Sequence, residues 1–419
     1  MLSLIKSLIP KKIFKAIQPA YHFALASIGA FLYGFPTRKL YVIGITGTKG
    51  KTSTAELINA VLEEAGYKTA LAGTLRFKIG PDSKPNLYKM TMPGRFMLQK
   101  FFRDAVRAGC SHAIIEMTSE GVKQFRHRFI YIDALIFTNL APEHIESHGS
   151  YEKYVAAKLE IGKQLLQSEK SNPLFIGNAR TPETKKFTEL PIKNVKLFSL
   201  KDAEPYETLR DKSTFTWHGE KVTTHLVGEF NIENCLAALT LGEALYIPTP
   251  KIISALQKFK GIAGRMEEIK RGQNFTVIVD YAHTPDSLEA VYKAYEKYRK
   301  ICVLSGTGGG RDKWKRPKMG EIASRYCDQI ILTDEDPYDE DPKAIVNEIK
   351  VGIKNPNTEI EMERRVAIRK AIAKAKEGDV VLITGKGTDP YIMGPHGTKT
   401  PWSDSRVAAE ELEKLGFGE

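Results

Sequence analysis

"LYVIGITGTKGKTSTAELINAVL" (residues 40–62) joins a short apolar run to an amphipathic one through a turn rich in glycine and hydroxyl side chains. A strand that enters a helix through such a turn points backbone N–H groups and the positive end of the helix at one place, which suits phosphate oxygens. Lys51 would then reach the β- and γ-phosphates of ATP, and the Thr52 hydroxyl would bind Mg²⁺. The other residues predicted to contact ATP here are Gly47, Thr48, Gly50 and Ser53. A glycine-rich turn without phosphate is the alternative, since Ile45 stands where the strict pattern has its first glycine.

The length and charge of the chain limit the possible functions. Its 419 residues predict two or three domains, and its formal charge of +12 favours anionic partners such as nucleotides and sugar phosphates. The sequence has no zinc-ligand spacing, no aromatic RNA signature and no base-reading helix. We therefore expect small-molecule substrates and no nucleic acid.

The four cysteines are scattered through apolar segments and form no C-x-x-C pair. They are Cys110, Cys235, Cys302 and Cys327. This usage predicts buried free thiols in a reducing cytosol.

The first 39 residues contain no Asp or Glu and surround an apolar stretch at 20–35 with basic side chains. The basic residues are Lys6, Lys11, Lys12, Lys15, Arg38 and Lys39. The apolar stretch is shorter than the roughly 20 residues that a membrane-spanning helix needs. Residues 1–38 are therefore interpreted as a basic, apolar helical leader, which either makes a peripheral contact with an anionic inner membrane surface or packs against the protein itself.

From residue 39 onward, short apolar strands alternate with amphipathic helices, as in a parallel sheet covered on both faces. This α/β pattern predicts a central P-loop ATPase domain with a mainly parallel sheet at 39–262 and a Rossmann-like C-terminal domain at 263–419. The predicted strands of the first domain are 40–46, 69–73, 111–117, 132–138 and 172–178, and its helices include 51–66, 95–108 and 151–167. A hairpin is expected to turn near Gly219.

The form G-x-T-G-T-x-G-K-T resembles the ATP-binding loop of the Mur ligase family, the ATP-dependent amide-forming synthetases of peptidoglycan precursors. Further motifs extend the resemblance from residue 40 to about residue 410. In "IIEMTSEGVKQFR" (114–126), Glu116 ends a buried strand, where a carboxylate can take Mg²⁺. The run resembles the E-V-S-S-H-x-L-x-x-x-R motif of the member that adds the third peptide residue. The resemblance implies that Ser119 and Arg126 contact the acceptor peptide, and Thr91 is assigned to the same substrate.

"FTNLAPEHIESHGSYEKYVAAKLEI" (137–161) resembles the family's F-T-N-L-x-x-D-H-L-D-Y-H-G and Y-x-x-A-K segments. The resemblance implies that His144 binds a second Mg²⁺ and that Lys158 carries CO₂ as a carbamate, which turns the lysine into an anionic metal ligand. From the residues alone, an ordinary loop histidine and a lysine on a charged helix face are the alternatives.

Four later segments also resemble the family. "LVGEFNIENCLAAL" (226–239) implies that Asn231 and Asn234 meet the adenine, although helix capping is the alternative. "GRMEEI" and "VIVDYAHTPDSLE" imply that Arg265 reaches the γ-phosphate and Asp280 the ribose when the domains close. "GTGGGRDKWKRPKMG" implies a phosphate- or carboxylate-facing loop through Arg311, Lys315 and Arg316, with a solvated basic turn as the alternative.

The expected amino-acid pocket departs from the family pattern. Members that add diaminopimelate have D-N-P-R where this chain has "EDPY" (335–338), and their G-K-G-H-E reads "GKGTD" (385–389) here. The residues assigned to the pocket are Asp336, Tyr338, Gly385 and Asp389. Loss of the arginine while acids remain predicts a basic amino acid such as lysine or ornithine, and a solvated acidic loop is the alternative. The chain also shows only its leader where relatives have a UDP-binding domain, so the acceptor is held differently or is not a UDP-sugar.

Together the motifs predict a cytoplasmic ligase that uses ATP and two Mg²⁺ ions to add an amino acid to the carboxylate of a muramyl-peptide precursor. The γ-phosphoryl group would convert the carboxylate to an acyl phosphate, which the amine attacks. The residues assigned to catalysis are Lys51, Glu116, His144, Lys158 and Arg265. The alternatives are a folylpolyglutamate-type or other poly-amino-acid ligase, a membrane-associated ATP-binding scaffold without catalysis, and a plain P-loop kinase.

Overall fold

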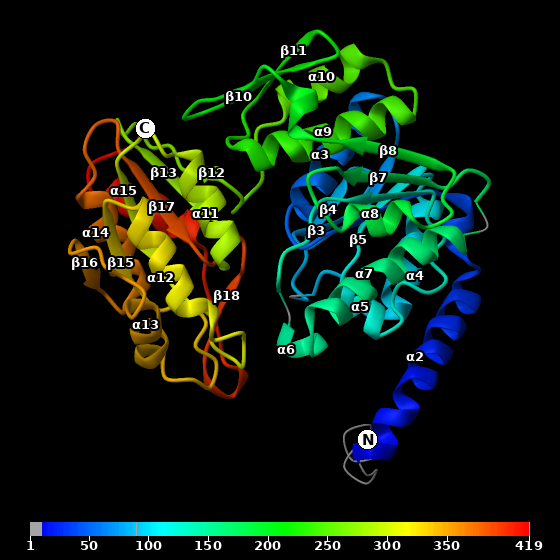
Figure 1. Cartoon of the computed structure of the whole chain (residues 1–419), viewed down its shortest axis with the longest axis horizontal. Coiled ribbons are helices and arrows are strands. Elements are labelled where there is room, and N and C mark those ends of the chain that lie inside the picture. The colour runs from blue at the N-terminus through cyan, green and yellow to red at the C-terminus, as the bar shows by residue number, and fades with distance from the viewer. Residues whose placement is uncertain (1–10, 89, 144, 169, 419) are drawn as a thin grey trace. The chain divides into compact units, whose positions relative to one another are not determined.

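The computed structural model describes residues 11–88, 90–143, 145–168 and 170–418, in two compact units (Figure 1). The first unit comprises Met1–Glu143, His148–Glu204 and Glu233–Leu256, and the second comprises His144–Ser147, Pro205–Ile232 and Gln257–Glu419. Each unit has its own mainly parallel sheet and its own apolar core. The predicted α/β class is therefore confirmed, while the predicted limits 1–38, 39–262 and 263–419 stay predictions.

The first unit is built on an eight-stranded sheet in the order β4-β3-β2-β5-β1-β6-β7-β8, in which only the β2–β3 and β3–β4 pairs are antiparallel. Its strands are β1 (Tyr41–Thr46), β2 (Thr69–Ala72), β3 (Arg76–Ile79), β4 (Asp82–Pro85), β5 (His112–Glu116), β6 (Ala134–Phe137), β7 (Leu174–Asn178) and β8 (Asn194–Phe198). β1 is central because its apolar, β-branched side chains suit a strand covered on both faces. Ile45 of β1 pairs with Glu116 of β5, so the glycine-rich turn begins beside the predicted metal ligand.

The helices that precede residue 260 carry apolar side chains at helical spacing. In α4, Leu98, Phe101, Phe102 and Ala105 are buried. The helices are α2 (Lys11–Tyr33), η1 (Pro36–Lys39), α3 (Lys51–Glu64), α4 (Arg95–Arg107), α5 (Ser119–Lys123), α6 (Ile145–His148), α7 (Tyr151–Leu166), α8 (Thr184–Thr188), η2 (Leu200–Ala203), α9 (Glu229–Ala244) and α10 (Thr249–Lys258).

The second unit contains a six-stranded sheet in the order β12-β13-β17-β14-β15-β16, parallel except at β12–β13. Ile278 of β13 lies in one apolar core, and Val277 and Val279 lie in another, so both faces of the sheet are covered. The elements of this sheet and its helices are β12 (Glu267–Glu268), β13 (Thr276–Asp280), α11 (Pro285–Ala294), β14 (Lys300–Leu304), α12 (Lys315–Tyr326), β15 (Gln329–Leu332), α13 (Pro342–Lys350), β16 (Thr358–Ile360), α14 (Arg364–Ala373), β17 (Val380–Thr384), η3 (Pro395–Gly397) and α15 (Asp404–Lys414). Two small antiparallel sheets contain β9 (Glu207–Thr208), β10 (Ser213–Trp217) and β11 (Glu220–Thr224), and β18 (Tyr391–Met393) and β19 (Lys399–Pro401).

Every strand and helix that the sequence predicts by range is present, and the predicted hairpin is β10–β11 with Gly219 in its turn. The structure adds four edge strands that the sequence did not predict, namely β4, β8, β12 and β16, and β3, which lies next to β4.

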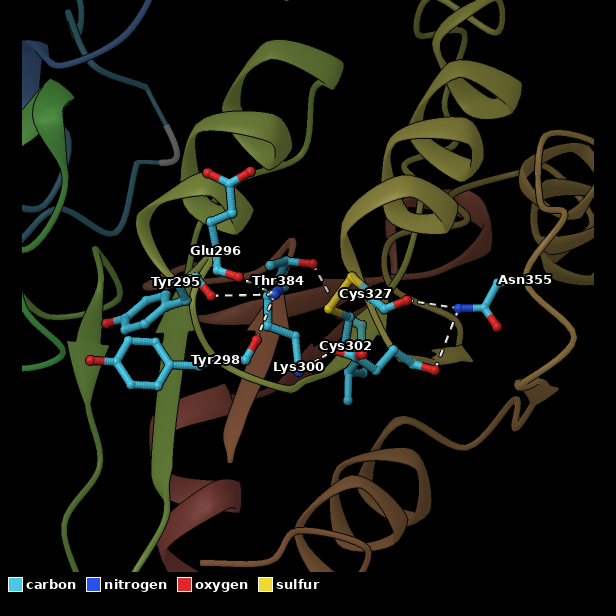
Figure 2. Close-up of a disulfide and its surroundings, with 10 residues drawn as sticks. Tyr295, Glu296, Tyr298, Lys300, Cys302, Cys327, Asn355 and Thr384 are labelled. Atoms are coloured by element: carbon cyan, nitrogen blue, oxygen red, sulfur yellow. Dashed lines mark hydrogen bonds between the residues drawn. A yellow bond between two sulfur atoms is a disulfide. The ribbon is translucent and has the colours of Figure 1, made fainter. Parts of the chain in front are cut away.

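Cys302 and Cys327 form a disulfide, so the prediction of free thiols is wrong for this pair (Figure 2). Cys302 lies in β14, and Cys327 precedes β15, the strand that pairs with β14. This pairing brings the two Cα atoms to 6.1 Å although 25 residues separate them in the chain. Figure 2 also shows Asn355, whose Nδ2 donates to the carbonyl oxygen of Cys327 at 2.7 Å. Cys110 is a buried free thiol, as predicted, and Cys235 is buried.

The predicted helical leader is α2, and one side of it packs on the first unit. Ala26 and Ala30 are buried, Gly29 lies against Phe96 of α4, and a guanidinium nitrogen of Arg103 donates to the carbonyl oxygen of Tyr33 at 2.8 Å. Packing against the protein, one of the two predicted alternatives, therefore applies to this side. Among the described residues, no helix has the length and apolar character that crossing a bilayer requires.

A buried ion pair joins α14 to α15 in the second unit. The Arg364 guanidinium donates to both carboxylate oxygens of Asp404, at 2.8 and 2.6 Å, and neither side chain is more than 2% exposed. The same guanidinium donates to the carbonyl oxygen of Thr384, at the end of β17, at 2.9 Å. Trp402 Nε1 donates to Asp404 at 2.8 Å. The pair therefore connects two helices to the central strand.

We expect Asp404→Asn to destabilise the protein by about 3 to 5 kcal/mol, because it leaves the Arg364 guanidinium buried without its counter-charge. Glu410→Gln is the matched control, since Glu410 pairs with Arg365 at 2.7 Å but is 37% exposed, and a surface pair contributes about 1 kcal/mol or less. Urea unfolding followed by circular dichroism measures both variants. Equal losses would contradict this account of the buried pair.

Candidate functional site

The turn between β1 and α3 depends on two glycines with positive φ, Gly47 at 148° and Gly50 at 78°. A Cβ on Gly47 would lie 2.0 Å from the Thr138 hydroxyl oxygen, and a Cβ on Gly50 would lie 2.6 Å from Asn234 Oδ1. Glycine suits both the conformation and the space. The loop thereby keeps its backbone close to the N-terminus of α3, the geometry that a phosphate-binding loop requires. Contact of the loop with ATP stays a prediction.

The side-chain nitrogens of two lysines contact the loop. Lys51 Nζ donates to the carbonyl oxygens of Gly47 and Thr48, both at 2.9 Å. Lys158 Nζ, from α7, donates to the carbonyl oxygen of Gly47 at 2.8 Å. Burial lowers the pKa of Lys158 well below its ordinary value, and the charge of Lys51 lowers it further, while Glu143 raises it. The environment therefore favours the neutral amine, the form of a lysine that reacts with CO₂.

Glu116, the last residue of β5, is 1% exposed and is surrounded by hydroxyl and N–H groups. Its two oxygens accept from Thr52 Oγ1 at 3.1 and 3.0 Å and from the Thr74 amide and hydroxyl at 2.7 and 2.9 Å. Thr74 Oγ1 also lies 3.0 Å from Thr91 Oγ1. Hydroxyl and carboxylate oxygens are ligands that Mg²⁺ prefers, so Thr52 and Glu116 fit this ion. His144 lies outside the described residues, within which no group of three or more His, Cys, Asp or Glu could hold a metal.

The segment "FTNL" (137–140) holds the loop from the neighbouring strand β6, a role that the sequence analysis did not assign. Thr138 Oγ1 donates to the carbonyl oxygen of Lys49 at 2.6 Å. Asn139 accepts from the Lys49 amide at 2.9 Å through Oδ1, and from the Thr48 amide at 2.9 Å through its carbonyl oxygen. The polar run directly follows a strand that pairs with β1. This position is the sequence feature that could have indicated its role.

Ser119 and Glu120 share one histidine in the first unit. His148 Nε2 lies 3.1 Å from Ser119 Oγ and 3.2 Å from Glu120 Oε1. Glu120, which stands where the family motif has a histidine, therefore contacts a histidine supplied by α6.

Arg126 and Arg95 converge on Gln124. Arg126 Nη2 donates to Gln124 Oε1 at 2.6 Å, and Arg95 donates to the Gln124 carbonyl oxygen. The Nε atoms of both arginines are buried without an acceptor in the described part of the chain. Burial lowers the pKa of both, the charge of Arg126 lowers that of Arg95 further, and Glu120 partly offsets the shift of Arg126. Arg95 was not predicted from the sequence, although it is a basic residue only four positions after Thr91.

Asn231 and Asn234 have different partners. Asn231 Nδ2 donates to the carbonyl oxygen of Val227 at 2.9 Å, just before α9 begins. Asn234 Oδ1 accepts from Thr54 Oγ1 at 3.2 Å and lies beside Gly50. Asn234 thus contacts the nucleotide loop in the first unit, and the adenine assignment of both stays a prediction.

In the second unit, Arg265 and Asp280 lie at the end of β13. The Arg265 guanidinium lies over the Tyr281 ring, 4.3 Å from its centroid, and its Nε is buried without an acceptor in the described chain. The Asp280 carboxylate accepts from the amides of Met266 and Ala282, both at 2.7 Å. Asp280 therefore fixes the backbone next to Arg265, and its ribose role stays a prediction.

Lys386, which follows β17, is fully buried, and its ammonium group balances the negative charge of two carboxylates. Its Nζ donates to Asp336 Oδ1 at 2.8 Å and to Asp389 Oδ2 at 3.3 Å. Asp336 also accepts from the Met393 amide at 2.8 Å. The Asp336 side chain is 4% exposed and the Asp389 side chain 23%. Asp389 is therefore the more accessible acid of the predicted amino-acid pocket.

Tyr338 and Arg311 lie beside the same glycine loop. A Cβ on Gly309 would lie 2.8 Å from the Tyr338 ring, so this loop packs on the residue that replaces the family arginine. Burial works against the charge of Arg311, but the neighbouring tyrosines and Glu335 raise its pKa overall. Gly385, with φ 113°, leaves room for the Glu335 carboxylate, because a Cβ there would lie 2.6 Å from Oε2.

Residues 45–242 match the family described as Mur ligase middle domain, and residues 264–387 match the Mur ligase, glutamate ligase domain. A UDP-N-acetylmuramyl-tripeptide synthetase of Roseiflexus sp. (strain RS-1) is 36% identical over 428 residues, which cover 96% of this chain and 84% of that protein. A UDP-N-acetylmuramoyl-L-alanyl-D-glutamate--2,6-diaminopimelate ligase of Halalkalibacterium halodurans is 36% identical over 402 residues, with 93% and 82% covered.

A solved structure described as UDP-N-acetylmuramoyl-L-alanyl-D-glutamate--2,6-diaminopimelate ligase is similar, with a TM-score of 0.63, 26% identity, and 90% of this chain and 79% of that chain covered. Folylpolyglutamate synthase of Mycobacterium tuberculosis has a TM-score of 0.69 but 16% identity, with 94% and 95% covered, and shares the fold alone. The predicted resemblance is confirmed by sequence identity over nearly the whole chain. This protein belongs to the Mur ligase family of ATP-dependent amide-bond ligases.

Proposed function

We propose that this protein joins an amino acid to the carboxylate of a muramyl-dipeptide acceptor, with conversion of ATP to ADP and phosphate. The observation that carries this proposal is the meeting of Lys51, Thr52 and Glu116 at one glycine-rich loop. The names of the relatives, a tripeptide synthetase and diaminopimelate ligases, support this step over the others of the family. We place the reaction in the cytoplasm, where ATP is available, and at the inner face of the membrane because the leader is basic and apolar.

The reaction needs two steps, because a carboxylate repels a nucleophile and oxide does not leave. Transfer of the γ-phosphoryl group breaks its bond to the β-phosphate oxygen and forms a bond to a carboxylate oxygen, which yields an acyl phosphate and ADP. The amine nitrogen then attacks the carbonyl carbon and loses a proton as the carbon–oxygen bond to phosphate breaks. The products are an amide and inorganic phosphate.

The residues of the loop would stabilise the negative charge of the phosphate oxygens during transfer. Lys51 would exchange its two carbonyl acceptors for phosphate oxygens and follow the negative charge that develops during transfer. Mg²⁺, as two ions held by Thr52, Glu116, His144 and a carbamylated Lys158, would neutralise the phosphate oxygens. The lowered pKa of Lys158 supports carbamylation. Arg265 would contact the γ-phosphate.

Phosphate release by the purified chain tests the proposal, with ATP, Mg²⁺, a muramyl dipeptide with or without UDP, and a panel of amino acids. We expect turnover to need acceptor and amino acid together. Lys51→Ala should lower kcat/KM about a hundredfold to a thousandfold, because it removes a cation that stabilises transferred charge. Lys49→Ala is the matched control, since Lys49 is in the same loop and pairs with Glu143 instead. Turnover without an amino acid would indicate a kinase, and no turnover with any acceptor would indicate a scaffold.

We also propose that the incoming amino acid has a cationic side chain, as in lysine or ornithine. A second carboxylate on the substrate would meet Tyr338, which carries no positive charge, where diaminopimelate-adding relatives have arginine. Asp336 is already compensated by Lys386. Asp389 shares the same ammonium at a longer distance and is partly exposed, so its carboxylate suits a distal ammonium.

We expect Tyr338→Arg to raise kcat/KM for diaminopimelate relative to lysine by about tenfold, because a guanidinium binds a carboxylate through two charge-assisted hydrogen bonds. Tyr338→Gln is the control for loss of the ring without gain of charge and should give no such change. Competition between the two amino acids at one acceptor concentration measures the ratio. A wild-type enzyme that prefers diaminopimelate would refute the assignment of the pocket.

On the acceptor side, we propose that Arg95 and Arg126 bind one anionic group of the acceptor, near Ser119 and Thr91. The two guanidinium groups meet at Gln124, and no ion pair links either to a carboxylate in the described part of the chain. Like charges held together in a partly buried place are stabilised by an anion. The pair therefore supports recognition of a carboxylate or phosphate.

We expect Arg95→Gln to raise KM for the acceptor about tenfold, by loss of a charge-assisted hydrogen bond, and to leave KM for ATP unchanged. Arg107→Gln is the matched control, because Arg107 is exposed at the other end of α4. Initial rates at varied acceptor concentration measure the effect. An unchanged acceptor KM would remove Arg95 from the site.

A further inference from the structure

The side of α2 that faces away from α4 is a continuous apolar surface. Its residues recur every three or four positions and so lie along one side of the helix. We name them the α2 stripe: Ile17, Ala20, Tyr21, Ala24, Ile28, Phe31 and Leu32. The large members are 55% (Ile17), 47% (Tyr21), 49% (Ile28), 73% (Phe31) and 65% (Leu32) exposed. Soluble proteins seldom expose such a patch unless it meets a partner or a membrane.

The α2 stripe faces outward because the other side of the helix is fixed to the first unit. Ala26 and Ala30 are buried, and the Phe23 ring lies 5.5 Å from the Phe129 ring. In Figure 1, α2 (blue) runs along the edge of this unit, and its N-terminal half extends away from the sheet. The helix thus has one side packed on the protein and one side left uncovered among the described residues.

The charges around the α2 stripe indicate what kind of surface binds it. The sequence contains no Asp or Glu before Glu56, and the apolar segment is preceded by Lys6, Lys11, Lys12 and Lys15. Arg38 and Lys39, both exposed, follow it. An apolar protein groove would fit the stripe but would not require positive charge at both ends. An anionic lipid surface satisfies both features, because acyl chains take the apolar side chains and headgroups take the cations.

The structure assigns α2 as a docking helix that lies in the plane of an anionic membrane surface, with the α2 stripe inserted and Arg38 and Lys39 at the headgroups. The helix does not cross the bilayer, because no helix in the described part of the chain is long and apolar enough. This assignment is independent of the ligase chemistry. Docking is measured by lipid binding and ligation by turnover, so the two proposals can fail separately.

Cosedimentation of the full chain with lipid vesicles tests the docking helix. We expect binding to vesicles of mixed phosphatidylcholine and phosphatidylglycerol to be at least about tenfold tighter than to phosphatidylcholine alone, and to weaken with salt, because each basic residue near the surface adds to the attraction. Phe31→Ser combined with Leu32→Ser should weaken binding about tenfold or more by removing inserted apolar area. Val351→Ser is the matched control, since Val351 is 79% exposed in the second unit.

The double variant should keep the ATP turnover of the parent chain, since neither residue contacts the candidate site. If it loses turnover or folding, Ile17→Ser, near the other end of the stripe, replaces it in the same assay. No binding to anionic vesicles, or equal binding by parent and stripe variants, would overturn the proposal. A dimer in sedimentation velocity that disappears with the same substitutions, without vesicle binding, would assign the stripe to a second copy of the chain instead.

Discussion

The parallel pairing of β1 with both β5 and β6 is the constraint on which the nucleotide site depends. In this register Ile45 lies opposite Glu116, and Thr46 lies opposite Phe137. The carboxyl ends of three strands therefore meet at one edge of the sheet, where the glycine-rich turn begins. A shift of one residue would turn every side chain of β1 to the other face and remove Glu116 from Thr52. The sheet register, more than any single residue, brings the hydroxyl, the carboxylate and the loop together.

Two fully buried lysines show how the same side chain serves different purposes. Lys158 donates to neutral oxygens in the first unit, and burial together with Lys51 lowers its pKa. Lys386 is also disfavoured by burial, but Glu335, Asp336 and Asp389 raise its pKa overall. The surroundings of Lys158 therefore favour a reactive neutral amine. Those of Lys386 favour a permanent cation that holds the neighbouring carboxylates in place. Net charge in the immediate surroundings, not burial alone, decides between these outcomes.

Much of the fold follows from local pattern, and much of the site does not. The apolar runs of β1 and β5 and the glycine-lysine-threonine turn predict their elements correctly because each signal is contained in a few neighbouring residues. β4, "DSKP", is exposed throughout and has no apolar alternation, so only its pairing with β3 makes it a strand. The Cys302–Cys327 disulfide, the Lys386–Asp336 pair and the Arg95–Arg126 pair join segments far apart in the chain. Such contacts depend on sheet order and loop path, which residue spacing does not encode.

α2 connects the proposed membrane surface to the proposed acceptor site. The helix packs on α4 through Gly29 and Phe96, and α4 begins with Arg95. A docked α2 would therefore hold the Arg95–Arg126 pair near the headgroup layer. An anionic acceptor carried at the membrane would reach these arginines without leaving the surface, while ATP would bind at the loop of β1 in the same rigid sheet. Because α2 is packed on the unit and not attached by a flexible linker, the distance from the surface to the acceptor arginines would stay constant.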